Sequence, residues 1–304
     1  MKVILVAPAW GNGWQPTLTK AFEEAGHKAE WVHTESDYIR LKYWFDACLC
    51  MWADEAAVLL SQQIKKPFYT FIRAYEVFTE LPSQINWSNV KKLFYCNQNT
   101  ADIAAKIFSE TIVAQTKNLD CFVIPNWIDI EQYPFKERDN NLSIAMVCDL
   151  NFKKNIPLAI QILAELPDKY TLHIAGQCQD ESLVLYMENL ILSLGLERRV
   201  KMYERMPHKD IPGFLANKSY ILSTSMREGC PMNVLEAMAM GIKPVVHNWP
   251  GAKDIFPTEN IFSKVSDVLS ILESPYKSKD YRAMVENNHS LNNARKLVEL
   301  VTEH

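Results

Sequence analysis

Short apolar runs alternate with longer amphipathic stretches along the whole chain. The apolar runs predict strands at residues 2–7, 29–33, 47–51, 68–72, 92–96 and 121–124, and later at 143–148, 171–175, 200–203, 220–223 and 244–247. The amphipathic stretches predict helices at residues 16–25, 54–63, 100–109, 156–165, 182–194 and 232–240. A regular alternation of strand and helix favours an α/β protein with parallel sheets covered by helices on both faces.

The alternation stops once and then starts again, which predicts two domains. Residues 133–141, with the sequence YPFKERDNN, are polar, contain a proline and have almost no periodicity, so we interpret them as a linker. We therefore predict a first domain over residues 1–138 and a second domain over residues 139–280. Residues 281–304 are expected to form a C-terminal helix that packs back on the first domain.

Composition excludes several classes of protein. Hydrophobic residues make up 48% and charged residues 22% of the chain, which is ordinary globular usage. The 32 Lys and Arg against 36 Asp and Glu exclude a strongly basic nucleic-acid binder. Seven cysteines with no C-x-x-C pair favour a reduced, cytoplasmic protein. No run approaches the roughly 18 apolar residues of a membrane span, so we expect a soluble protein.

The first candidate ligand loop, residues 8–14, follows the opening strand and contains Gly11 and Gly13. Loops after parallel strands form ligand sites, and glycines allow close approach of the backbone. The loop is not a dinucleotide fingerprint, because Pro16 stands where the third glycine of G-x-G-x-x-G belongs. A loop that lines a ligand site and a plain tight turn both remain open.

Residues 220–247 are more informative, because they form a strand–helix–strand unit with a ligand-binding pattern. Pro231 is well placed to open the helix and Gly241 to end it. The helix N-terminus directs backbone N–H groups at the strand ends, where a diphosphate would bind. Glu228 and Glu236 flank this position, and carboxylates there suit hydroxyl groups rather than phosphate. A nucleotide sugar fits this arrangement, and a helix turn with solvated glutamates is the alternative.

The motifs resemble one enzyme family in order and spacing. The string EGCPMNVLE over residues 228–236 resembles the E-x7-E signature of retaining glycosyltransferases of family four. Further matches are IPNWID at 124–129, KKN at 153–155, LHIAG at 172–176, and residues 200–207. The resemblance implies a GT-B fold, in which two Rossmann-like, doubly wound parallel-sheet domains face a cleft.

The resemblance also implies roles for individual residues. Glu236 would bind the ribose, Glu228 would hold the transferred sugar, and Lys154 would neutralise charge on the leaving diphosphate. Other expected donor-binding residues are Gly176, Arg205, Met206, Gly229, Cys230, Pro231, Met232, Val234 and Leu235, of which Arg205 and Met206 would frame the base and Val234 and Leu235 would meet the diphosphate. The expected acceptor-side residues are Gly11, Gly13, Arg73 and Glu76.

Departures from the family pattern concern the phosphate site. Cys148 and Asp149 stand where the family usually has Gly and Arg, so a working enzyme needs Asp149 turned away or held by a cation such as Lys153. The chain has no D-x-D motif, which agrees with a metal-independent family without a cofactor. His173, His208 and His247 show no ligand spacing, and we interpret them as structural.

We therefore predict a retaining glycosyltransferase that moves a sugar from a UDP- or GDP-sugar to a hydroxyl acceptor, which would be a glycan, a lipid-linked molecule or another alcohol. Cell-surface glycan assembly is the expected setting. One alternative is a catalytically impaired protein that binds nucleotide sugars or serves as a partner subunit, and another is a GT-B nucleotide-sugar epimerase. The lysine pairs at 65–66 and 91–92 are consistent with weak contact to an anionic membrane, although a solvated rim is the preferred interpretation.

Overall fold

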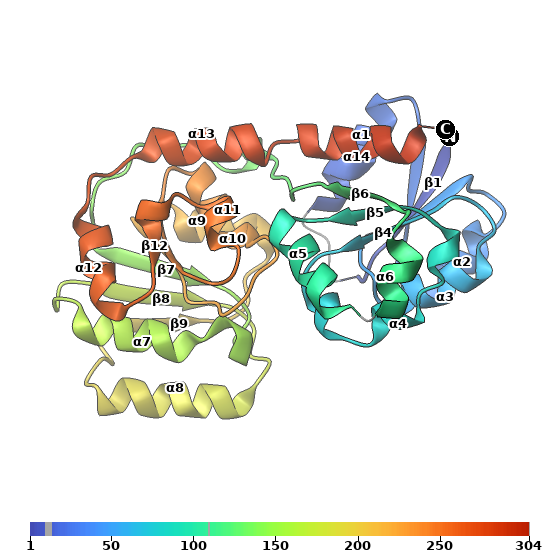
Figure 1. Cartoon of the computed structure of the whole chain (residues 1–304). Helices are drawn as coiled ribbons and strands as arrows, with labels where there is room; N and C mark the ends of the chain where they lie inside the picture. The colour runs from blue at the N-terminus through green and yellow to red at the C-terminus, as the bar shows by residue number, and fades with distance from the viewer. Residues whose placement is uncertain (10–13, 109, 304) are drawn as a thin grey trace. The chain divides into compact units, whose positions relative to one another are not determined.

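The computed structural model describes residues 1–9, 14–108 and 110–303, and the predicted positions Gly11 and Gly13 lie outside these ranges. The chain folds into two compact units (Figure 1). Unit 1 contains Met1–Asp129 and His289–His304, and unit 2 contains Ile130–Asn288. Within the described residues, each unit is built on one six-stranded parallel sheet.

The sheet of unit 1 has the strand order β2-β1-β3-β4-β5-β6, so the order reverses between β1 and β3. Its strands are β1 (Lys2–Val6), β2 (Lys28–Val32), β3 (Ala47–Cys50), β4 (Phe68–Ile72), β5 (Val90–Tyr95) and β6 (Asp120–Val123). Its helices are α1 (Gln15–Glu24), α2 (Glu35–Leu41), α3 (Glu55–Gln63), α4 (Leu81–Gln84), α5 (Gln98–Ile107), α6 (Glu110–Thr116) and α14 (Asn292–Thr302).

Alternate residues of the unit 1 strands pack into two cores, one on each face of the sheet. On one face Leu5 packs with Phe22 of α1 and Leu297 of α14, whereas on the other face Ile4 packs with Leu60 of α3. Burial on both faces explains the continuous apolar runs in the sequence.

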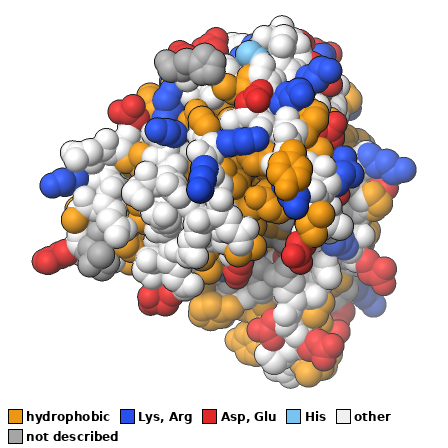
Figure 2. Space-filling model, turned by 90° about the vertical axis from the view of Figure 1, so that its right-hand side faces the viewer, with side chains coloured by type: hydrophobic (Ala, Val, Ile, Leu, Met, Phe, Trp, Pro, Cys, Tyr) orange, Lys and Arg blue, Asp and Glu red, His pale blue; other side chains and the backbone are white. Residues whose placement is uncertain are grey.

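Figure 2 shows a side of the molecule on which hydrophobic side chains gather near the middle, among charged side chains of both signs.

The sheet of unit 2 has the strand order β12-β11-β10-β7-β8-β9. Its strands are β7 (Ser143–Val147), β8 (Thr171–Ala175), β9 (Val200–Tyr203), β10 (Tyr220–Ser223), β11 (Lys243–His247) and β12 (Ile261–Phe262). Its helices are α7 (Ile156–Glu165), α8 (Glu181–Ser193), α9 (Ile211–Leu215), α10 (Met232–Ala239), α11 (Ala252–Ile255), α12 (Val265–Glu273) and α13 (Ser278–Asn288). This is the doubly wound order of a Rossmann fold, so the predicted fold class is confirmed.

Both ends of unit 2 differ from the predicted boundaries. The units separate after Asp129 instead of after residue 138, because residues 130–138 bind unit 2, as the hydrogen bond from the Arg138 amide to Ser278 Oγ at 3.0 Å shows. The C-terminal segment is two helices instead of one. The helix α13 packs on α10, and α14 packs on α1. The helical conformation is interrupted between them at His289, whose Nδ1 lies 2.9 Å from the Asn126 carbonyl oxygen.

The predicted pattern does not include the strand β12 or the helices α2, α4, α6, α9, α11 and α12. The strand β12 has two residues, which is too short for a periodicity to be visible. The helix α2 has seven residues, and its signal is a capping box instead of a long amphipathic pattern. Thr34 Oγ1 accepts a hydrogen bond from the Asp37 amide, and the Asp37 carboxylate accepts one from the Thr34 amide.

Candidate functional site

The candidate site lies at the point in the unit 2 sheet where the strand order reverses. The strands β7 and β10 are neighbours there, and the chain leaves them toward opposite sides of the sheet. Ligands of doubly wound sheets bind at the carboxyl ends of such strands. In this protein two loops meet at that position: the β7 loop, residues 148–155, and the β10 loop, residues 224–231.

Two hydrogen bonds to backbone carbonyl oxygens hold these two loops together. The Met226 amide donates to the Lys153 carbonyl oxygen at 3.0 Å, and Thr224 Oγ1 donates to the Lys154 carbonyl oxygen at 2.9 Å. Asn155, at the end of the β7 loop, has a left-handed backbone with φ of 48°. Asparagine tolerates this conformation better than most residues, and it allows the sharp turn from the loop into α7. The loops therefore present their side chains as one structure.

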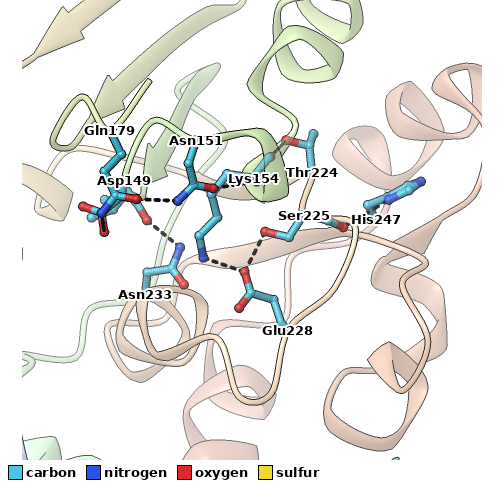
Figure 3. A network of polar contacts seen from close by, with 10 residues as sticks. Asp149, Asn151, Lys154, Gln179, Thr224, Ser225, Glu228, Asn233 and His247 are labelled. Carbon is cyan, nitrogen blue, oxygen red and sulfur yellow. Dashed lines mark hydrogen bonds and ion pairs between the residues drawn. The ribbon is translucent and has the colours of Figure 1, made fainter. Parts of the chain in front are cut away.

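Lys154 and Glu228 form an ion pair between the two loops (Figure 3). The Lys154 ammonium donates to Glu228 Oε1 at 2.6 Å, and Ser225 Oγ donates to the same oxygen at 2.7 Å. The two side chains are only 16% and 9% exposed. The site therefore places an ammonium and a carboxylate side by side in a mostly buried position.

The pair shifts the pKa of both groups. Burial by itself would raise the pKa of Glu228, but the positive charges of Lys154 and Lys153 and the hydrogen bonds hold it below its ordinary value. Burial would lower the pKa of Lys154, but the charge of Glu228 and its hydrogen bond hold it above its ordinary value. Both groups therefore stay ionised at neutral pH, and Lys154 can offer its charge to an anionic ligand.

The helix α10 begins beside this ion pair. Pro231 is its N-cap and Gly241, with φ of 81°, follows its end, as the sequence predicts for the C-terminus. Asn233 Nδ2 donates to the Val147 carbonyl oxygen at 2.6 Å, which fixes the start of α10 over the end of β7. The predicted loop residues Gly229 and Cys230 connect the ion pair to this helix.

The amides of Val234 and Leu235, which are predicted to meet a diphosphate, already have an acceptor in the first turn of α10. Both donate to the Pro231 carbonyl oxygen, at 3.1 and 3.3 Å, so the first turn of α10 already engages them. A diphosphate would have to share these amides with Pro231. The N–H groups of the very first helical residues have no carbonyl four residues earlier inside the helix, so they are better placed for an anion. Met232 provides the first of them.

Glu236, one turn into α10, is buried and has a histidine partner that sequence analysis missed. His208 Nε2 lies 2.9 Å from Glu236 Oε1, and Tyr133 Oη lies 3.1 Å from the same ring nitrogen. The sequence alone favours a structural role for His208, because no spacing motif includes it. It lies 28 positions from Glu236, in a turn after β9, so only the meeting of β9 and α10 in space reveals the contact.

The loops after β7, β8 and β9 carry the remaining residues predicted for the donor. Gln179 Nε2 donates to Asp149 Oδ2 at 3.0 Å, so the hydrogen-bond partner of Asp149 is an amide instead of Lys153 (Figure 3). Arg205 donates to Gln177 Oε1 at 2.9 Å. Met206 follows Arg205 in the loop after β9. Gly176, at the end of β8, lies directly against the backbone of Cys148.

Arg73 and Glu76 of unit 1 are buried and bound within that unit. Arg73 Nε donates to the Met51 carbonyl oxygen at 2.7 Å, and its guanidinium lies 4.9 Å from the Trp14 ring centre and 5.0 Å from that of Trp52. Glu76 accepts hydrogen bonds from the backbone amides of Arg73 and Ala74. These contacts organise the loop after β4, and the acceptor-side role of both residues stays a prediction.

Two features of the described residues bear on metals and membranes. In residues 1–9, 14–108 and 110–303, no three His, Cys, Asp or Glu side chains are grouped so that they could hold a metal ion. No helix of the same ranges combines the length and the apolar character needed to cross a bilayer.

Comparison with known proteins finds a family match over about half of the chain. Residues 128–273 match the family model for glycosyl transferases group 1. One of the chains of human phosphatidylinositol N-acetylglucosaminyltransferase is 28% identical over 162 residues. That match covers 51% of this chain and 33% of the human chain, so the match spans about a third of that relative's length.

Solved structures resemble the whole chain. Sucrose-phosphate synthase from Thermosynechococcus elongatus has a TM-score of 0.81 at 13% identity, with 99% of this chain and 98% of that chain covered. Anabaena HepE in complex with UDP-glucose has a TM-score of 0.78 at 14% identity, with the same coverage. At these identities the likeness shows the fold. Residues 128–273 thus match the glycosyl transferases group 1 family, and the chain has the fold of GT-B glycosyltransferases.

Proposed function

We propose that the protein is a retaining glycosyltransferase that moves a sugar from a UDP- or GDP-sugar to a hydroxyl acceptor. The observation that carries this proposal is the buried Lys154–Glu228 pair at the strand-order reversal of unit 2. A cation suits a leaving diphosphate, and a carboxylate suits sugar hydroxyls, so the pair offers both parts of a nucleotide sugar a partner. The family match over residues 128–273 and the HepE structures with UDP and with UDP-glucose support a nucleotide sugar as the donor.

The proposed chemistry needs no resident cofactor or metal. The bond between the anomeric carbon and the diphosphate oxygen breaks, and a bond from the acceptor oxygen to the anomeric carbon forms on the same face. The acceptor proton passes to the leaving phosphate. The Lys154 ammonium stabilises the charge that develops on this phosphate, and Glu228 orients the sugar. The acceptor class, a role in cell-surface glycan assembly and a cytoplasmic location belong to this proposal.

Glu236 tests the donor assignment. If its carboxylate accepts hydrogen bonds from ribose, Glu236→Ala should weaken binding of the preferred nucleotide sugar by about 1.5 to 3 kcal/mol, the range for hydrogen bonds to a charged group. Isothermal titration calorimetry with UDP- and GDP-sugars measures the change. Glu188→Ala, on the exposed side of α8, is the matched control and should bind as the unchanged protein does. Equal affinity in a folded Glu236→Ala protein would remove Glu236 from the site.

The stereochemistry of the product tests the reaction class. We expect proton NMR to show that the transferred sugar keeps the anomeric configuration of the donor, because residues 228–236 resemble the signature of retaining enzymes. An inverted product contradicts the assignment. Incubation of the donor without an acceptor distinguishes a transferase from the epimerase alternative. An epimerase would convert the sugar of the donor itself under these conditions.

Asp149 favours a second candidate, a nucleotide-sugar-binding protein with impaired catalysis. A carboxylate about 4 Å from a phosphate is repelled by about 4 kcal/mol at an effective dielectric constant near 20. The hydrogen bond from Gln179 gives Asp149 a partner in the loop after β8, although Asp149 remains exposed. Donor binding without any transfer or hydrolysis would support this second candidate.

A further inference from the structure

The buried carboxylate of Glu236 is covered by a half-exposed side chain. The Glu236 side chain is 8% exposed, whereas that of His208 is 46% exposed. The His208 ring lies edge-to-face against Tyr133, with ring centres 6.3 Å apart and planes at 80°. A half-exposed ring on a short turn, residues His208–Asp210, therefore lies over a buried anion.

This arrangement gives the carboxylate a hydrogen-bond donor when no ligand is bound. A buried charge is unfavourable unless hydrogen bonds or an opposite charge compensate it. An ionised carboxylate only accepts hydrogen bonds, so His208 Nε2 must carry the hydrogen across the 2.9 Å contact. The two hydroxyls of a ribose offer the same kind of donor to the same oxygen.

We infer that His208 competes with the ribose hydroxyls of the nucleotide for Glu236, so that donor binding displaces the His208 hydrogen bond and becomes tighter as the pH rises. This inference rests on the proposed function, because it requires Glu236 to be the ribose ligand. It makes His208 a residue that sets donor affinity without touching the reacting atoms.

The direction of the pH effect follows from the charges around the ring. In the described part of the chain, Glu236 from α10 and Tyr133 are the titratable groups that contact His208, and Lys209 and Asp210 flank it in its own turn. The hydrogen bond to Glu236 raises the pKa of His208, against the opposite effect of burial. At pH values below the ordinary pKa of histidine, the contact therefore contributes its full stabilisation to the ligand-free protein. This stabilisation is lost as the pH rises through the raised pKa of His208. Competition with ribose is strongest at low pH.

The experiment measures Kd for UDP-glucose and GDP-glucose between about pH 6 and pH 8, across the titration of histidine. Nucleotide sugars are suitable probes because they lack the terminal phosphate that titrates near pH 6 in free nucleotides. For whichever of the two nucleotide sugars binds, we expect Kd to fall about three- to tenfold as the pH rises over this range, since one pKa unit corresponds to a factor of ten. Near the pKa of His208, calorimetry in buffers of different ionisation enthalpy should show proton release on binding.

Three variants separate His208 from other groups. His208→Ala should bind more tightly than the unchanged protein at low pH and show a flat pH profile. His208→Gln keeps a donor for Glu236 without titrating, so it should also give a flat profile and no proton release. His247→Gln is the control, because His247 lies beside the β10 loop, 3.3 Å from the Ser225 carbonyl oxygen, and its replacement should leave the pH dependence intact.

The outcomes distinguish this inference from the proposed function. Two results would overturn the proposed competition of His208 with ribose while donor binding itself stands. One is a pH dependence that survives in a folded His208→Ala protein, and the other is tighter binding at low pH in the unchanged protein. If neither sugar nucleotide binds at any pH, the proposed function fails and this inference fails with it. Should His208→Ala not fold, the His208→Gln profile decides in the same way.

Discussion

Replacing Lys154 with alanine should lower kcat at least about a hundredfold, the scale seen when one donor to a transition-state anion is removed. The ammonium is held in place by Glu228 at 2.6 Å and is mostly buried, so its charge acts in a region that water screens poorly. Lys153, the neighbouring cation, contributes its backbone carbonyl to the contact between the loops. Initial rates under saturating donor measure the effect.

Loss of stability has to be separated from loss of catalysis in this variant. Lys154→Ala leaves Glu228 buried without its cation, and breaking a buried pair can cost about 3–5 kcal/mol. Lys154→Arg keeps the positive charge and should recover part of the activity, and thermal unfolding shows whether each variant is folded. Lys201→Ala, at an exposed position of β9, is the matched control. Near-normal turnover of a folded Lys154→Ala protein would contradict the assigned role.

Gly176→Ala should lower the free energy of unfolding by at least about 3 kcal/mol, the upper end of the usual effect of overpacking. A Cβ atom at this position would lie 1.7 Å from the Cys148 carbonyl oxygen and 2.6 Å from its carbonyl carbon. Both atoms belong to the backbone, so no side-chain rotation relieves the clash. The ends of β7 and β8 would have to separate, which also displaces the β7 loop.

Thermal unfolding measures this change, with an expected decrease in Tm of roughly 6–12 °C. Gly213→Ala is the matched control, because a Cβ there meets no heavy atom within 4 Å and the residue lies in α9. Alanine in a helix is more stable than glycine by about 0.5–1 kcal/mol, so the control should be neutral or slightly stabilised. A Gly176→Ala protein as stable as the control would show that the two strand ends tolerate separation.

Several elements could be predicted from the sequence because their signals are local. The strands β4, β8 and β10 have the predicted bounds, since parallel strands buried on both faces appear as short apolar runs. The helix α10 ends before Gly241 because that residue has a positive φ, which glycine adopts without strain. The fold class follows from the alternation of these elements.

The tertiary structure decided which of these elements meet. Periodicity shows which side of a segment is buried but not what covers it. The sequence therefore did not show that the C-terminal helix is interrupted at His289, or that α13 and α14 pack in different units. The Lys154–Glu228 pair joins residues 74 positions apart, and it forms because the strand order places β7 beside β10. His208 reaches Glu236 because the turn after β9 and the helix α10 meet in space. The sequence by itself determined most strands, the longer helices of the α/β alternation and the fold class, because these depend on local burial. The partners of the charged side chains depend on distances between segments far apart in the chain, and only the tertiary structure determines those distances.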